Sequence, residues 1–94
     1  MRRAAKVDST QAEIVKALQR CGVSVEVIGK PVDLLICCRG VVSLMECKTP
    51  AKDGGRDRLT QEQIEFIARW PAAVHIVRSP EEAIAAAVGQ EAMA

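Results

Sequence analysis

The chain has 94 residues, of which 49% are hydrophobic and 27% charged, and its 13 basic and 12 acidic residues give a net charge of +1. This length predicts a single domain, residues 1–94, small but large enough for a hydrophobic core. No apolar run approaches the ~20 residues of a membrane span. The balanced charge excludes a uniformly basic nucleic-acid surface, so that any contact with DNA must come from local clusters.

The N-terminal segment and the cysteines indicate a cytoplasmic protein. Residues 1–8 are expected to form a flexible arm, and they lack the apolar stretch of a signal peptide. The cysteines have no zinc-ligand spacing, and three of them lie inside apolar runs. We therefore expect reduced thiols packed in the core rather than disulfides, at Cys21, Cys37, Cys38 and Cys47.

The first regular element is expected to be a helix over about residues 10–21, because apolar residues recur there at helical spacing. Gly22 suits the left-handed position that follows a helix. Thr10 and Glu13 match a capping box. Glu13 therefore has two interpretations: it caps its own helix, or it points over the strands that follow and adds a carboxylate to a site there.

Three strands are expected next. Residues 23–28 alternate enough for a first strand, and 29–31 form a turn. Two apolar runs, 33–38 and 41–47, are then separated only by Arg39-Gly40. That spacing is typical of a hairpin with a two-residue turn, and the three runs together predict an antiparallel meander.

The two-residue turn determines which side chains meet. Counting outward from it places Asp33 opposite Glu46, and residues directly opposite share a face with Cβ atoms about 4.5–5.5 Å apart. Because side chains alternate along a strand, Lys48 joins them and Cys47 points away. Two carboxylates this close favour a proton or a bound cation between them, and Mg²⁺ takes such oxygen ligands. The alternative is a solvated strand edge.

A polar loop over residues 49–58 leaves the sheet directly after Lys48. Three of its basic residues would lie near anything bound at that edge: Lys52, Arg56 and Arg58. We favour a loop that a substrate orders. The alternative is a connector whose charges are partly cancelled by its two aspartates.

A second helix is expected over about residues 61–70. Thr60 and Gln63 match a second capping box, so that Gln63 either caps the helix or points toward the site. Phe66 and Trp70 are one helical turn apart, and we expect both in the core rather than stacked on bases.

The C-terminal part predicts a fourth strand over 73–78 and a last helix over about 80–88. We expect His75 to be packed or exposed rather than catalytic. Ser79 and the Pro after it are a strong helix start, and Gly89 is expected to end the helix. The fourth strand rejoins the sheet after a helix, so the fold is α/β with a mixed four-stranded sheet flanked by helices.

Four blocks of this sequence, in the same order and over roughly residues 8–78, resemble a known family. An Asp followed on the next strand by Glu-x-Lys resembles the signature of the PD-(D/E)XK nuclease superfamily. The fit is closer to its virus-type replication-repair nuclease (VRR-NUC) domain, especially the stand-alone phage members. One departure is Val32, which separates Pro31 from Asp33. The blocks are Gln11–Val15, Gly29–Leu35, Glu46–Lys48 and Leu59–Phe66.

The resemblance implies a restriction-endonuclease-like αβββαβα core with a metal site. Asp33 and Glu46, together with Glu13 and the backbone carbonyl of Cys47, would hold one Mg²⁺ or Mn²⁺. Such an ion polarises a phosphodiester and activates water. Lys48 would orient or deprotonate that water, or neutralise charge on the phosphate.

The resemblance also implies a role for Gln63 beside the catalytic lysine. The DNA would be held through its phosphates, without base readout. The residues expected to make these contacts are Lys30, Lys52, Arg56 and Arg58.

The function implied is a metal-dependent, structure-selective DNA endonuclease. We expect a homodimeric Holliday-junction-type resolvase of phage replication and repair, working in the host cytoplasm, because a two-fold dimer can cut opposite strands of a junction. Alternatives are a monomeric flap or nicking nuclease, a non-catalytic DNA-binding or toxin–antitoxin-type module, and a structural homodimer that uses the hairpin face as its interface.

Overall fold

The computed structural model describes residues 9–49 and 58–93, and side chains up to residue 89. The predicted arm, residues 1–8, lies outside them. The elements are α1 (Ser9–Arg20), β1 (Ser24–Val27), β2 (Leu34–Cys38), β3 (Val41–Cys47), α2 (Gln61–Arg69), β4 (Val74–Val77) and α3 (Pro80–Met93). Predicted boundaries agree within one residue at each end, except in α3. That helix continues through Gly89, so the prediction that it ends there was wrong.

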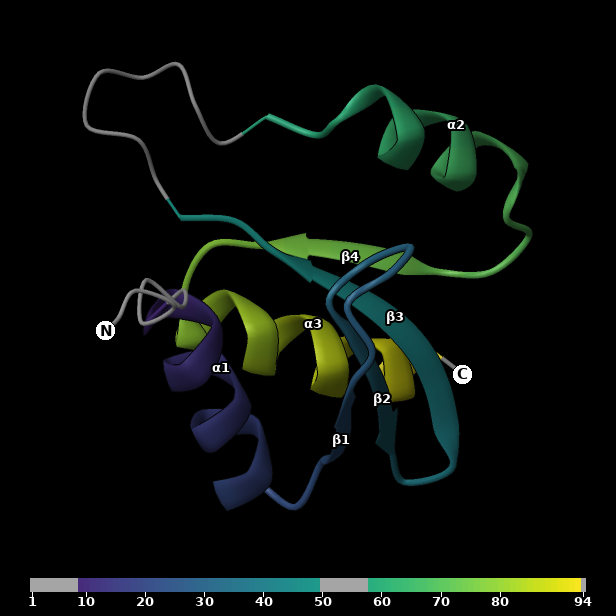
Figure 1. Ribbon diagram of the computed structural model, residues 1–94. Helices are drawn as coiled ribbons and strands as arrows, with labels where there is room; N and C mark the ends of the chain where they lie inside the picture. The colour runs from purple at the N-terminus through teal and green to yellow at the C-terminus, as the bar shows by residue number, and fades with distance from the viewer. Residues whose placement is uncertain (1–8, 50–57, 94) are drawn as a thin grey trace.

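The four strands form one sheet in the order β1-β2-β3-β4. The first three are antiparallel to their neighbours, and β4 is parallel to β3. Helices α1 and α3 cover one face, and α2 lies over the other (Figure 1). The predicted mixed sheet with flanking helices is therefore confirmed. None of the helices in the described part of the chain is long and apolar enough to cross a membrane.

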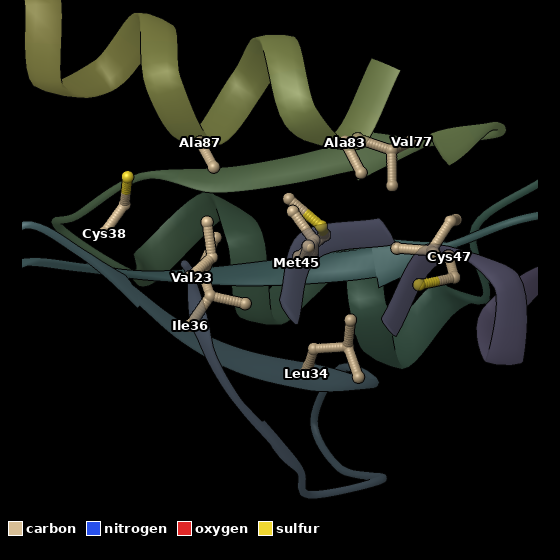
Figure 2. Packing of buried hydrophobic residues seen from close by; sticks show 11 residues of the cluster. Val23, Leu34, Ile36, Cys38, Met45, Cys47, Val77, Ala83 and Ala87 are labelled. Carbon is tan, nitrogen blue, oxygen red and sulfur yellow. The ribbon is translucent and has the colours of Figure 1, made fainter. Parts of the chain in front are cut away.

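The main hydrophobic core lies between the sheet and the α1–α3 layer. Figure 2 shows Met45 of the sheet on the side of Ala83 and Ala87 of α3, and Leu34 and Cys47 belong to the same buried cluster. A smaller cluster under α2 consists of Val32, Leu44 and Phe66, joined by partly buried neighbours. Most of the burial is thus on one face of the sheet.

Local sequence explains where α1 ends. Gly22 has φ +84°, and its backbone N–H donates to the carbonyl of Gln19 at 3.0 Å. The N–H of Val23 donates to the carbonyl of Leu18, also at 3.0 Å. These two bonds form a Schellman motif. Val23 and Leu18 are buried together in the core, so the predicted role of Gly22 is confirmed.

The β2–β3 turn is as short as predicted. Arg39 and Gly40 both have positive φ, 50° and 88°, as a type I′ turn requires, and this turn matches the twist of the strands. Cys38 pairs with Val41, and the register continues without a bulge along the hairpin.

The cysteine prediction holds in part. All four thiols are free, and Cys38 and Cys47 are buried. Cys37 is only half-buried, since alternation turns it to the opposite face from Cys38. Cys21 is exposed, so its placement in the core was wrong: it lies just beyond the last turn of α1, where the chain runs along the surface.

Candidate functional site

Two carboxylates meet at the open end of the β2–β3 hairpin. Leu34 pairs with Met45, so the next opposed positions are Asp33 and Glu46, as predicted. The backbone N–H of Asp33 donates to Glu46 Oε1 at 3.0 Å. The N–H of Cys47 donates to Asp33 Oδ2 at 2.9 Å. Side-chain oxygens thus accept bonds where the backbone ladder of the hairpin stops, and each acid is oriented by the strand opposite. We call Asp33 and Glu46 the acid pair.

Lys48 completes the cluster. Its Nζ lies 3.3 Å from Glu46 Oε2, and the two side chains are 16% and 6% exposed. The backbone N–H of Lys48 donates to the carbonyl of Val77 at 2.9 Å, which fixes the lysine against β4. A buried carboxylate needs such a partner, because desolvation of an unpaired charge costs several kcal/mol, on the order of the whole stability of a typical domain. Cys47 points into the core, as predicted.

Glu13 lies on the exposed side of α1, whose buried residues Ile14 and Leu18 face the main core. The hydroxyl of Thr49 donates to Thr10 Oγ1 at 3.1 Å, and this bond places the first turn of α1 beside the end of β3. Because α1 begins at Ser9, Thr10 lies inside the helix, so its predicted N-cap position was wrong.

Among the side chains that the structure describes, residues 9–49 and 58–89, no third carboxylate joins the acid pair. No three His, Cys, Asp or Glu side chains in these ranges gather closely enough to hold a metal ion. The role of Glu13 as a ligand therefore stays a prediction. Asp33 and Glu46 remain a suitable donor set, since Mg²⁺ is commonly held by one or two carboxylates and completed by waters.

Of the two interpretations of Gln63, the structure shows the first: Gln63 caps α2. Its Oε1 accepts the backbone N–H of Thr60 at 3.1 Å, and its own N–H donates to Thr60 Oγ1 at 3.1 Å. This reciprocal pair is the capping box of α2. The side chain is therefore held at the helix start, and its proposed place beside Lys48 stays a prediction.

A groove of about 640 Å³ lies between α2 and the β1–β2 loop. We call it the α2 groove. Neither acid of the pair lines it. The loop is tied to the site, since the carbonyl of Asp33 accepts the N–H groups of Ile28 and Gly29 at 2.8 and 3.1 Å. The lining residues are Gly29, Lys30, Pro31, Thr60, Glu62, Gln63, Glu65, Phe66 and Arg69.

The predicted phosphate-binding residues are only partly placed. Lys30 is exposed and lines the α2 groove, and Arg58 is exposed just before α2. Lys52 and Arg56 lie outside the described residues. Of these two described residues, Lys30 is the nearer to Asp33 in the sequence.

Sequence reasoning missed two features of this region. Trp70 is 43% exposed, whereas Phe66 is 7% exposed as expected, so the placement of Trp70 in the core was wrong. The position of Trp70 next to Pro71 at the end of α2 was a usable signal, because a helix terminus lies at the rim of a layer. The second feature is that the acid pair accepts hydrogen bonds from backbone N–H groups. Nothing in the sequence indicated these bonds, because two residues can lie opposite each other in a hairpin without making them.

Comparison with family models, with curated proteins and with solved structures finds no match to this chain. The site is therefore interpreted from its own geometry.

Proposed function

We propose that this chain is a metal-dependent phosphodiester hydrolase that acts on DNA, with the acid pair and Lys48 at its centre. The observation that supports this most is the convergence of two carboxylates at the end of one hairpin, with an ammonium group 3.3 Å from one of them. Carboxylates that attract a divalent cation, beside a lysine, are suited to stabilising the charge that develops during phosphodiester hydrolysis.

Asp33 and Glu46 would hold one Mg²⁺ or Mn²⁺, with the backbone carbonyl of Cys47 as a further ligand and Glu13 approaching from α1. The ion would supply positive charge that polarises the phosphodiester and acidifies water. One oxygen of each acid accepts a backbone N–H, which keeps both carboxylates oriented before any ligand arrives. Lys48 would orient the attacking water or neutralise the phosphate.

The substrate we propose is branched DNA, cut by a homodimer as in a Holliday-junction resolvase of phage replication and repair. Support comes from the charge: a net charge of +1 gives one copy of this domain little electrostatic attraction to a duplex. Two copies related by a two-fold axis would present two sites to opposite strands. Lys30 and Arg58 would contact phosphates, together with Lys52 and Arg56. Gln63 would assist near the lysine only if its side chain left the capping box with Thr60.

The test is cleavage of a four-way junction, a flap and a linear duplex, each with Mg²⁺ and with EDTA. Wild type should cut branched DNA only with Mg²⁺. Glu46→Gln keeps an acceptor for the N–H of Asp33 but removes a charged ligand, so it should fold and bind DNA without cutting. Lys48→Ala should lower cleavage strongly. Full activity of Glu46→Gln would contradict the proposal.

A second candidate is a non-catalytic DNA-binding module. The observation favouring it is that both acids already accept backbone hydrogen bonds, as a purely structural clasp of the hairpin would require. In that case wild type binds DNA equally well in EDTA and never cleaves it, and Mg²⁺ changes neither binding nor stability.

A further inference from the structure

Trp70 is an exposed aromatic side chain held in place by a buried one. Phe66 and Trp70 are the only aromatic residues in the sequence. Their ring centroids lie 5.0 Å apart, with planes at 28°. Phe66 is packed with Val32 and Leu44, whereas 43% of Trp70 stays open to solvent. The indole is therefore a preformed, flat apolar surface at the end of α2.

Cationic side chains line the α2 groove, which the indole adjoins through Phe66. The guanidinium carbon of Arg69 lies 5.3 Å from the Phe66 ring centroid, and Arg69 lines the α2 groove on the helix side while Lys30 lines it on the loop side. Glu62 and Glu65 also line the groove, so its formal charge is balanced. A balanced groove does not suit a long run of phosphates along a duplex. One or two nucleotides fit better, with a phosphate near a cation of the groove and a base on the indole outside it, since Trp70 does not itself line the groove but stacks on Phe66, which does.

The groove is connected to the acid pair through the chain. Lys30 is three residues from Asp33, a separation of at most about 11 Å for an extended chain, or about three nucleotide steps. The loop that carries Lys30 is fixed to the carbonyl of Asp33 by two hydrogen bonds. A strand whose phosphate lies at the acid pair can therefore have a nearby nucleotide in the α2 groove.

Resting on the nuclease function above, we propose that Trp70 stacks on an unpaired base of the bound DNA and makes the enzyme select DNA with unpaired nucleotides. In a continuous duplex both faces of each base are already stacked, and taking a base out costs a few kcal/mol. An unpaired base has a free face, and stacking it on an aromatic side chain strengthens binding without reading sequence. Selection for branches that carry an unpaired arm, such as a flap, then follows from base availability, whereas a four-way junction with fully paired arms would gain only from base faces exposed at its crossover.

Because the chain has one Trp, its intrinsic fluorescence reports on this position directly. The full chain is titrated in EDTA with a single-stranded oligonucleotide, a duplex carrying an unpaired arm, and a blunt duplex. We expect quenching with the first two and little with the third. Trp70→Ala should bind the first two about 5- to 150-fold more weakly, measured by anisotropy of labelled DNA.

Two further variants separate stacking from simple loss of surface. Trp70→Phe keeps a ring and should retain most of the affinity, whereas Trp70→Leu should not. Ile64→Ala is the matched control, since Ile64 of α2 is an apolar residue of similar exposure, 47% against 43% for Trp70, but has no ring on which a base can stack. It should bind like wild type. Equal affinity of Trp70→Leu and Trp70→Phe would overturn base stacking.

Other outcomes also decide the matter. Unchanged fluorescence on binding, or wild-type affinity in Trp70→Ala, overturns the inference. If Trp70→Ala binds DNA normally but elutes as a smaller species than wild type, the indole belongs to a protein interface instead. Quenching without cleavage under any Mg²⁺ condition would refute the nuclease and leave base stacking standing, and cleavage with no effect of Trp70→Ala would do the reverse.

Discussion

The two faces of the sheet are covered to very different extents. Leu34 and Leu35 are neighbours on β2 and point to opposite faces, yet Leu34 is fully buried under α1 and α3 while Leu35 is 37% exposed on the α2 side. Val42, also on the α2 side, is 59% exposed. A shallow apolar hollow remains around Leu35 and Val42, next to the part of the face that α2 covers.

The difference separates stability from chemistry. Apolar burial, the main source of folding free energy, is concentrated on the face that α1 and α3 cover, which we call the closed face. The face on the α2 side is called the open face. The open face holds the acid pair, Lys48 and the α2 groove. The short helix α2 covers only part of this face and leaves some apolar surface in water, while at the polar end of the hairpin Glu46 is buried and Asp33 and Lys48 are half-buried. The predictions below test this division, beginning with the largest expected effect.

Leu34→Ala and Leu35→Ala compare the two faces with the same substitution at adjacent positions. Leu34→Ala should lower the free energy of unfolding by about 2–5 kcal/mol, because it leaves a cavity in a closed core. Leu35→Ala should cost less than about 1 kcal/mol, since much of that side chain is already in water. Denaturant unfolding of both variants measures this. Equal costs would mean that the open face is covered in solution, for example by a second copy.

Glu46→Ala and Glu46→Gln separate structure from chemistry at the acid pair. Alanine removes the acceptor of the Asp33 N–H and the partner of Lys48, and should cost about 1–3 kcal/mol. Glutamine keeps a carbonyl acceptor and should cost clearly less. The measurement is again denaturant unfolding, without metal. If both variants are as stable as wild type, the hydrogen bond from the Asp33 N–H contributes nothing to the free energy of unfolding.

Mg²⁺ should stabilise the wild type through the open face. A ligand that binds only the folded state at ten times its dissociation constant adds about 1.4 kcal/mol to the free energy of unfolding. Thermal or denaturant unfolding across a Mg²⁺ series measures it, with Glu46→Gln as the control that should respond much less. An equal response of both proteins would place the ion away from the acid pair.

Ser43→Ala tests a buried hydroxyl on the closed face. Ser43 is 4% exposed, and its hydroxyl has no hydrogen-bond partner among the described residues. A buried, unpaired hydroxyl lowers stability, so alanine should raise the free energy of unfolding by up to about 1 kcal/mol. If Ser43→Ala instead lowered the free energy of unfolding by more than about 1 kcal/mol, the hydroxyl would have a partner.

Several features follow from local sequence because their causes are local. A two-residue turn containing Gly40 leaves one register for the hairpin, and with it the opposition of Asp33 and Glu46. The C-terminus of α1 follows from Gly22, and the N-terminus of α2 follows from the Thr60–Gln63 capping box, since both signals act within one helical turn. The helix over residues 80–93 began where Ser79 indicated: its Oγ accepts the N–H of Glu82 at 3.1 Å.

Other features could not be derived in this way. Gly89 continues a helix because the preceding turns pack Ala83 and Ala87 against the sheet, and tertiary packing overrides the weak helix propensity of one glycine. Cys21 and Trp70 were assigned to the core on hydrophobicity, but each follows the last residue of a helix, where packing ends. Hydrophobicity states what a side chain prefers and does not locate the edge of a layer.

By itself the sequence determined the order of elements, the hairpin register and the meeting of two acids and a lysine, because turn length and strand alternation are properties of neighbouring residues. Only the tertiary structure decided which face of the sheet is closed, that α1 presents Ile14 and Leu18 to the main core with Glu13 outside, and that the acid pair accepts backbone hydrogen bonds. Those outcomes depend on how separate elements pack together, and local patterns do not specify that packing.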